Sequence, residues 1–229
     1  MVVRANLEIE KIIIRIYADM VDLSLYLVTD RSLSYGRDLE WIVLEAVKGG
    51  VTMVQLREKD CTTRDFIKLA VRLKQKLEPY RVPLIINDRA DVALAADADG
   101  LHIGQSDMPY EIARRLLGYD KIIGLSVENM EQARQANLLD VDYIGISPVF
   151  GTQTKKDIAH PFGLEGVKEV ASFTNHPTVA IGGVNSSNAA DIVNAGANGI
   201  AVVSAICSAT SPKDAAKELI EKMKLKITI

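Results

Sequence analysis

Short apolar runs rich in β-branched residues recur along the chain and alternate with segments in which apolar residues return every three or four positions. The short runs predict eight strands, at residues 25–28, 52–56, 84–86, 100–103, 122–125, 143–146, 178–181 and 199–203. The intervening segments predict helices at residues 39–47, 66–77, 89–96, 112–117, 130–138, 164–171, 189–195 and 215–223. Several of these helices end in glycine shortly before the next strand, as expected at a helix C′ position.

Eight strand–helix units fill the length of a (β/α)8 TIM barrel, so we predict an α/β fold of this type. A doubly wound open sheet is the alternative, but the regular units and the lack of a GxGxxG motif after the first strand favour the barrel. No linker or low-complexity segment divides the chain, which predicts one domain over residues 1–229. Residues 1–24 precede the barrel, and residues 5–20 are expected to form an amphipathic helix that covers one end of it.

Composition and charge narrow the classes of function. The 229 residues carry 27 basic and 30 acidic side chains, a net charge of −3, so no overall field indicates binding to nucleic acid or to an anionic membrane. The cysteines, Cys61 and Cys207, lack motif spacing and fit a reducing cytosol. Charged residues interrupt the N-terminal apolar segment, unlike a signal peptide, and no run reaches the ~18 apolar residues of a membrane span. We therefore expect a cytoplasmic protein in which any anion site is local.

Two aspartates follow neighbouring strands of the predicted barrel. Asp88 comes just after residues 84–86 and Asp107 just after residues 100–103, with only a short helix between the two strands. Such a short crossover places the strands side by side in parallel, so both carboxylates reach the same edge of the sheet. Two carboxylates there can hold Mg²⁺, with substrate phosphates and water completing its shell. The alternative is that Asp88 caps the short helix and Asp107 caps the next one.

The second predicted strand ends in three long hydrogen-bond donors. Gln55, Arg57 and Lys59 are spaced by two, so in an extended segment they project from one face. Three such donors at the rim of a barrel suit the oxygens of a phosphate group. The alternative is a solvated edge with Glu58 and Asp60 as ion-pair partners, although an unpaired Gln55 amide within an apolar strand would be costly.

The loop after the sixth strand, residues 147–163, is long for a barrel of this kind. It contains Thr152, Thr154 and Lys155, two hydroxyls and a cation that could close over an anionic substrate. The same residue types are also ordinary in a solvated loop, so this motif is weak by itself.

The loops after the seventh and eighth strands are glycine-rich or begin a helix. Gly182 and Gly183 allow close approach of backbone N–H groups, and Ser204 stands where barrels often bind a monophosphate. The alternative is a tight glycine turn with Ser204 as a helix cap. Two anion sites and one metal suggest the joining of a phosphate-bearing molecule to a diphosphate-bearing one.

Five longer motifs contain most of the residues considered so far. In chain order they are VQLREKD, IINDRADVALAADADGLHIGQSD, IIGLSVEN, DYIGISPVFGTQTKKD and VAIGGVNSSNAADIVNAGANGIAVVSAI. Together, between about residues 25 and 206, they closely resemble the thiamin phosphate synthase family. That family has a (β/α)8 barrel and couples an aminopyrimidine methyl diphosphate to a hydroxyethylthiazole phosphate, releasing pyrophosphate. The resemblance implies a Mg²⁺-dependent transferase of thiamine biosynthesis, and it allows a homo-oligomer.

The resemblance also implies roles for individual residues. It implies that Asp88 and Asp107 bind Mg²⁺. It implies that the pyrimidine diphosphate is contacted by Gln55, Leu56, Arg57, Glu58, Lys59, Asn87, Ser126 and Lys155. It implies that the thiazole phosphate is contacted by Thr152, Gln153, Thr154, Gly183, Val203 and Ser204. Of these, the residues expected to act in catalysis, by stabilising the departing diphosphate in a dissociative, carbocation-like substitution, are Arg57, Lys59, Ser126 and Lys155.

Ser147 stands before Pro148 where many relatives have glycine, a departure that leaves the following threonines and lysine intact. His102 is interpreted as a packed barrel histidine, because the attacking thiazole nitrogen needs no general base.

The alternative functions are an isomerase barrel of the thiazole tautomerase kind and a non-catalytic phosphate-binding barrel. The pair Asp88 and Asp107, together with Lys155, argues against both.

Overall fold

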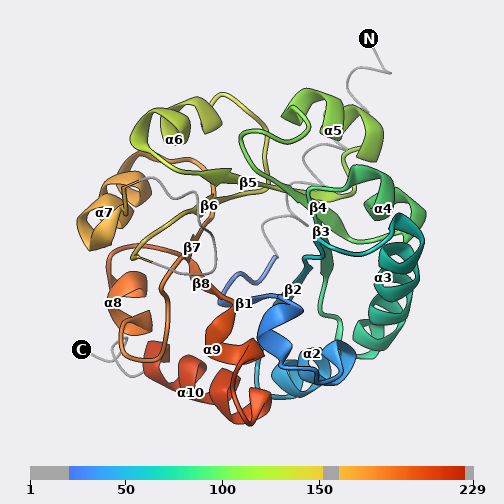
Figure 1. The fold of residues 1–229 in the computed structure, drawn as a ribbon. Helices are drawn as coiled ribbons and strands as arrows, with labels where there is room; N and C mark the ends of the chain where they lie inside the picture. The colour runs from blue at the N-terminus through green and yellow to red at the C-terminus, as the bar shows by residue number, and fades with distance from the viewer. Residues whose placement is uncertain (1–20, 152–159, 225–229) are drawn as a thin grey trace.

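A closed barrel of eight parallel strands, hydrogen-bonded in chain order, forms the centre of the molecule (Figure 1). The structure is a computed structural model that describes residues 21–151 and 160–224. Closure is made by pairing of the first strand with both the second and the eighth. The strands are β1 (Leu25–Val28), β2 (Met53–Leu56), β3 (Leu84–Asn87), β4 (Gly100–Ile103), β5 (Ile122–Val127), β6 (Tyr143–Ile146), β7 (Thr178–Ile181) and β8 (Gly199–Val202). The predicted (β/α)8 barrel is therefore confirmed, and the open sheet is ruled out.

Helices surround the barrel and connect successive strands (Figure 1). They are α2 (Leu39–Lys48), α3 (Thr63–Leu77), α4 (Ala90–Ala95), α5 (Tyr110–Leu117), α6 (Met130–Ala136), α7 (Gly163–Phe173), α8 (Ala189–Asn194), α9 (Ser204–Cys207) and α10 (Pro212–Lys224). Two short 3₁₀ turns, η1 (Ser32–Ser34) and η2 (Glu78–Tyr80), complete the described elements. The helix predicted at residues 5–20 lies outside the described residues. None of the described helices combines the length and apolar character needed to cross a membrane.

Two of the predicted helix starts differ from the structure for local reasons. Helix α3 begins at Thr63, three residues before the expected start, because the side chain of Thr62 accepts a hydrogen bond from the Asp65 amide and caps the helix. Helix α10 begins at Pro212 instead of residue 215, since proline is well suited to the first turn of a helix. Short α9 had been expected only as a helix start at Ser204.

Buried apolar side chains form two clusters, one on each side of the barrel wall. The larger cluster lies between the strands and the helices, and it includes Leu25, Leu27, Val54 and Leu56. The smaller cluster contains residues from alternate positions of the same strands, among them Tyr26, Met53, Ile85 and Tyr143. Successive residues of a strand point to opposite faces, which accounts for the division. The interior of the barrel is thus filled by side chains, as in other barrels of this type.

Candidate active site

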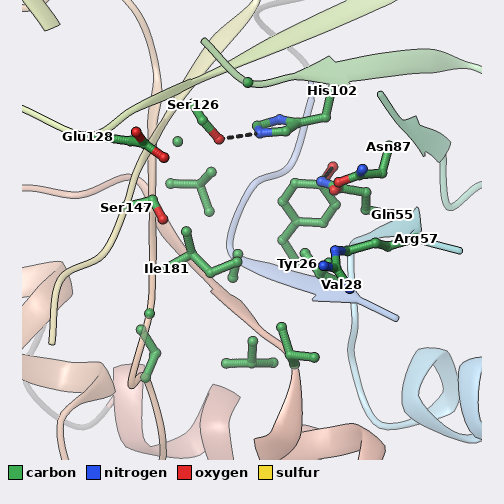
Figure 2. A pocket seen from close by; sticks show the side chains of 18 of the residues that line it. Tyr26, Val28, Gln55, Arg57, Asn87, His102, Ser126, Glu128, Ser147 and Ile181 are labelled. Carbon is green, nitrogen blue, oxygen red and sulfur yellow. Dashed lines mark hydrogen bonds between the residues drawn. The ribbon is translucent and has the colours of Figure 1, made fainter. Parts of the chain in front are cut away.

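A cavity of about 670 Å³ is lined by residues at the carboxyl ends of the strands and in the loops that follow them. This volume is typical of a small-molecule site. The predicted site residues that line it are Gln55, Arg57, Lys59, Asn87, Asp88, Asp107, Ser126, Gly183, Val203 and Ser204. Figure 2 shows Gln55, Arg57 and Asn87 on one side of this cavity, with Ser126 and Ser147 across from them.

The two aspartates lie at one part of the rim. Asp88 follows β3 in a left-handed conformation, with φ of 62°, and its carboxylate forms an ion pair with Lys59. The backbone amide of Asp88 donates to the carbonyl oxygen of His102 at 2.9 Å, which ties the ends of β3 and β4 together. The Asp107 carboxylate accepts a hydrogen bond from the Gly104 amide at 2.7 Å. The Asp88 carboxylate is thereby held by Lys59, and the Asp107 carboxylate by the Gly104 amide.

The structure does not support helix capping by these aspartates. The N-cap residue of α4 is Arg89 and that of α5 is Pro109, and neither helix start has a side-chain cap hydrogen bond. Burial, together with the neighbouring Asp88 carboxylate, raises the pKa of Asp107. A bound cation would stabilise the ionised form of Asp107 at this position.

A metal at this position would need ligands beyond the protein. Across residues 21–151 and 160–224 no cluster of three or more His, Cys, Asp or Glu side chains is placed to hold a metal ion. Mg²⁺ is commonly bound by only one or two carboxylates, with water and substrate phosphate oxygens as its other ligands. The donor set of Asp88 and Asp107 therefore fits Mg²⁺ that is shared with a phosphorylated substrate.

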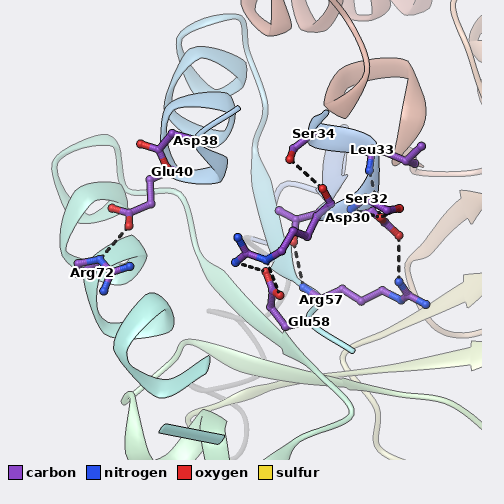
Figure 3. A network of polar contacts seen from close by, with 11 residues as sticks. Asp30, Ser32, Leu33, Ser34, Asp38, Glu40, Arg57, Glu58 and Arg72 are labelled. Carbon is purple, nitrogen blue, oxygen red and sulfur yellow. Dashed lines mark hydrogen bonds and ion pairs between the residues drawn. The ribbon is translucent and has the colours of Figure 1, made fainter. Parts of the chain in front are cut away.

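Arg57, one of the cationic side chains of the rim, is positioned by a network of polar contacts (Figure 3). The guanidinium of Arg57 donates to the Asp30 carboxylate at 3.1 Å, and the Arg57 backbone amide donates to Thr29 Oγ1 at 3.0 Å. Asp30 is itself fixed by the backbone amide of Ser32 at 2.9 Å. Because Asp30 holds the guanidinium from one side, Arg57 reaches the cavity in a defined orientation.

The solvated-edge interpretation of the second strand predicted the wrong partners. Glu58 pairs with Arg31 through two hydrogen bonds, of 2.8 and 3.0 Å, and Lys59 pairs with Asp88 across the rim. Gln55 is only 4% exposed and donates from Nε2 to the hydroxyl of Tyr26 at 2.9 Å. The amide is therefore satisfied inside the barrel.

The structure separates two predicted contact residues from the rest of the set. Leu56 is fully buried and belongs to the cluster between strands and helices, and Glu58 is engaged by Arg31. Neither side chain is among those that line the cavity. Since neighbouring residues of a strand face opposite sides, the inward position of Gln55 and Arg57 requires Leu56 and Glu58 to face away.

The part of the rim formed by the loop after β7 presents backbone atoms of two glycines. Gly182 and Gly183 have φ values of 103° and 65°, a region that favours glycine. A Cβ atom on Gly182 would lie 2.7 Å from Pro148 Cβ, and one on Gly183 would lie 2.8 Å from Gly151 O and Phe150 Cβ. The loops after β6 and β7 are thus in close contact, held also by a 3.0 Å hydrogen bond from the Phe150 amide to Gly182 O.

His102 is packed in the barrel interior and is one of the residues that line the cavity. Its Nε2 lies 2.9 Å from Ser126 Oγ, and its Nδ1 lies 2.9 Å from the hydroxyl of Tyr143 (Figure 2 shows the contact with Ser126). Burial lowers the pKa of His102 to about 4, so the ring is neutral at physiological pH. This environment agrees with the interpretation of His102 as a packed histidine.

Sequence reasoning missed two residues that belong to the site. Tyr26 and Tyr143 lie within apolar strand runs and are almost fully buried, yet their hydroxyls are 2.9 Å apart and connect Gln55 to His102. Tyr26 also lines the cavity. The sequence signal for both residues is a tyrosine at an inward-facing position of a predicted barrel strand.

Four further predicted residues lie outside the described part of the chain, namely Thr152, Gln153, Thr154 and Lys155.

Ser147, the serine that stands before Pro148, lines the cavity (Figure 2). Cys61 and Cys207 do not form a disulfide.

Comparisons with known proteins agree on one family. A family model described as thiamine monophosphate synthase matches residues 25–206. The thiamine-phosphate synthase of Albidiferax ferrireducens is 53% identical over 197 residues, which is 86% of this chain and 90% of the relative. That of Clostridium novyi is 49% identical over 199 residues, covering 87% and 98%. The solved thiamine phosphate pyrophosphorylase of Pyrococcus furiosus superposes with a TM-score of 0.82 at 38% identity, covering 89% and 96%. The chain therefore belongs to the thiamine monophosphate synthase family of transferases.

Proposed function

We propose that this chain joins 4-amino-2-methyl-5-(diphosphooxymethyl)pyrimidine to hydroxyethylthiazole phosphate, forming thiamin phosphate and pyrophosphate. The observation that carries this proposal is the arrangement of one cavity. An acid pair, Asp88 and Asp107, and two cations, Arg57 and Lys59, lie around the same mouth as the glycine-rich loop at Gly183. Such a mouth offers separate places for a diphosphate and a monophosphate.

The diphosphate of the pyrimidine is proposed to bind between the cations and the acid pair. Asp88 and Asp107 would hold Mg²⁺ there, and the bound ion would neutralise charge on the departing diphosphate. Arg57, held by Asp30, offers two N–H groups to phosphate oxygens, and Lys59 offers a point charge. The residues proposed to complete this part of the site, by their position in the cavity, are Gln55, Asn87 and Ser126.

The thiazole phosphate is proposed to bind at the opposite part of the rim. Gly183 presents its backbone without a side chain, and Val203 and Ser204 stand at the start of α9 and line the same cavity. The family resemblance adds Thr152, Gln153 and Thr154 from the loop after β6, with Lys155 directed to the diphosphate. Three residues that precede them in that loop contact the glycines after β7: Pro148 lies against Gly182, and Phe150 and Gly151 lie against Gly183. This contact supports the proposal that the loop after β6 belongs to the thiazole phosphate site.

The proposed substitution breaks the bond between the pyrimidine methylene carbon and the diphosphate oxygen. The bond that forms joins that carbon to the thiazole nitrogen, and pyrophosphate carries away the electron pair of the broken bond. The aminopyrimidine delocalises the positive charge that develops on the methylene carbon. The contribution of the protein is to orient both partners and to stabilise negative charge on the leaving group. His102, which is neutral and hydrogen-bonded at both ring nitrogens, is not needed as a base.

The test is to mix the purified protein with both substrates and Mg²⁺ and to measure pyrophosphate and thiamin phosphate. We expect the two products in equal amounts, and neither product when one substrate is left out. An isomerase barrel would convert a thiazole phosphate without releasing pyrophosphate. A non-catalytic barrel would bind phosphorylated ligands without forming product, so either result would contradict the proposal.

A further inference from the structure

Five polar side chains form a continuous hydrogen-bonded chain through the interior of the barrel, from β2 to β5. The contacts, each 2.9 Å long, join Gln55 to Tyr26, Tyr26 to Tyr143, Tyr143 to His102 Nδ1, and His102 Nε2 to Ser126 Oγ. We call these five residues the interior chain. All but Ser126 are at most 9% exposed, whereas Ser126 is half-buried and opens to the cavity.

The first member of the interior chain sets the direction of the other hydrogen bonds when each buried hydroxyl proton has an acceptor within that chain. Gln55 Nε2 is a donor and not an acceptor, so the Tyr26 hydroxyl accepts from it. We assign the Tyr26 proton to Tyr143, because this is the other hydrogen bond that the structure gives the buried Tyr26 hydroxyl. Tyr143, which accepts from Tyr26, donates to His102 Nδ1. A neutral imidazole has one N–H group, so that group is at Nε2, where it donates to Ser126 Oγ.

We propose that Tyr143 is a positioning residue that fixes the Nε2–H tautomer of His102 and so leaves the hydroxyl proton of Ser126 for an acceptor in the cavity. The acceptor is an oxygen of the diphosphate, and in this respect the inference rests on the function proposed above. A hydroxyl that accepts from imidazole is polarised, which strengthens its own donation to an anion. Ser126 thus presents a proton, and not a lone pair, to the leaving group.

The opposite direction is chemically defined as well. If Gln55 turned its carbonyl oxygen to Tyr26, every proton of the interior chain would reverse, and His102 would carry its proton on Nδ1. Ser126 would then donate to His102 Nε2 and present lone pairs to an anion, which is unfavourable. The tautomer of His102 therefore reports the direction of the whole interior chain.

Packing of the rings keeps the interior chain in place. The rings of His102 and Tyr143 are stacked, with centroids 5.5 Å apart and planes at 27°. Those of Tyr26 and Tyr143 meet edge to face, with centroids 5.9 Å apart. Gly124 leaves the room that the Tyr143 ring fills, because a Cβ there would lie 2.0 Å from its Cζ atom. Rigid packing of this kind allows one hydroxyl to set the tautomer of its neighbour.

The first experiment reads the tautomer in the protein without substrates, by ¹⁵N NMR of histidine side chains. His102 is assigned by comparison with the variants His160→Gln and His176→Gln, which remove the other two histidines. We expect the proton of His102 on Nε2, with Nδ1 as an unprotonated acceptor. A proton on Nδ1 would overturn the inference whether or not the protein makes thiamin phosphate, so failure of the proposed function is a separate result.

The second experiment is a double-mutant cycle with Tyr143→Phe and Ser126→Ala, followed by kcat and KM for both substrates. Each single variant should lower kcat by about 10- to 100-fold, the range for a hydrogen bond to a charged group, with a smaller change in KM. If Tyr143 acts through Ser126, then Tyr143→Phe should have little further effect on a Ser126→Ala enzyme. Independent, multiplicative effects would assign Tyr143 a merely structural role and contradict the proposal.

Tyr110→Phe is the matched control. The Tyr110 hydroxyl also makes a 2.6 Å hydrogen bond, to Asp140 O, but it does not line the cavity. It should leave kcat unchanged in both backgrounds, and thermal unfolding of all variants should show that each is folded. If Tyr143→Phe does not fold, the tautomer measurement on the unaltered protein still decides the matter.

Discussion

The contact between the loops after β6 and β7 makes Gly183→Ala an informative substitution. Gly183 has a φ of 65°, and holding alanine in this left-handed region costs about 1–2 kcal/mol. The new methyl group would also lie 2.8 Å from Gly151 O and from Phe150 Cβ. Overpacking of this kind typically costs about 1–3 kcal/mol. We therefore expect the free energy of unfolding to fall by about 2–5 kcal/mol.

Gly36→Ala is the control for the conformational part of this cost. Gly36 has a φ of 78°, but a Cβ there would meet nothing within 4 Å, so we expect a loss of only about 1–2 kcal/mol. Urea denaturation of both variants measures the difference, and steady-state kinetics should show a raised KM for thiazole phosphate in Gly183→Ala alone. Equal destabilisation by the two substitutions would refute the reasoning, because it would show that the loop contact yields without cost.

Three further predictions concern charged residues of the site. Lys155→Ala should lower kcat far more than it raises the KM for thiazole phosphate. Changes of equal size in kcat and KM would show that Lys155 stabilises the bound substrate as well as the transition state. Asp30→Asn removes the ion pair that holds Arg57, an ion pair worth about 1 kcal/mol. It should raise the KM for the pyrimidine diphosphate by up to about 5-fold. An unchanged KM would show that Arg57 does not need Asp30 to hold its orientation. In the metal-free protein the pKa of Asp107 is raised, so the folded state binds a proton at this carboxyl group more tightly than the unfolded state does. The stability of the protein therefore falls as pH rises from the ordinary pKa of an aspartate through the raised pKa. Asp107→Asn should therefore raise the melting temperature of the metal-free protein at neutral pH while it lowers turnover, and a lower melting temperature would contradict this sign.

The barrel was predictable because its signal is repeated. Eight apolar runs alternate with helical segments, and each repeat supports the others, so errors of a few residues at single boundaries do not change the fold. The early start of α3 shows the limit of this reasoning. Thr62 is a favourable capping residue, but only the geometry of the turn decides that its hydroxyl reaches the Asp65 amide.

The candidate site was predictable where strand spacing decides direction. The spacing by two of Gln55, Arg57 and Lys59 correctly placed all three side chains on the cavity, and the same rule, applied strictly, excludes Leu56 and Glu58 from it. The partnership of Tyr26 with Tyr143 could not be read in this way. The two residues are 117 positions apart, and their contact depends on how the strands are arranged in the closed barrel.

The central claim is that Asp88 and Asp107 hold Mg²⁺ for the departing diphosphate. Its most direct test is pyrophosphate release by Asp88→Ala over a range of Mg²⁺ concentrations, with and without a chelator. Asp91→Ala is the matched control, because Asp91 pairs with Arg89 and does not line the cavity. We predict that Asp88→Ala stays folded and loses about 100-fold or more of its turnover, equivalent to about 3 kcal/mol, while Asp91→Ala remains active and Mg²⁺-dependent. Near-normal turnover of Asp88→Ala in the presence of chelator would contradict the claim.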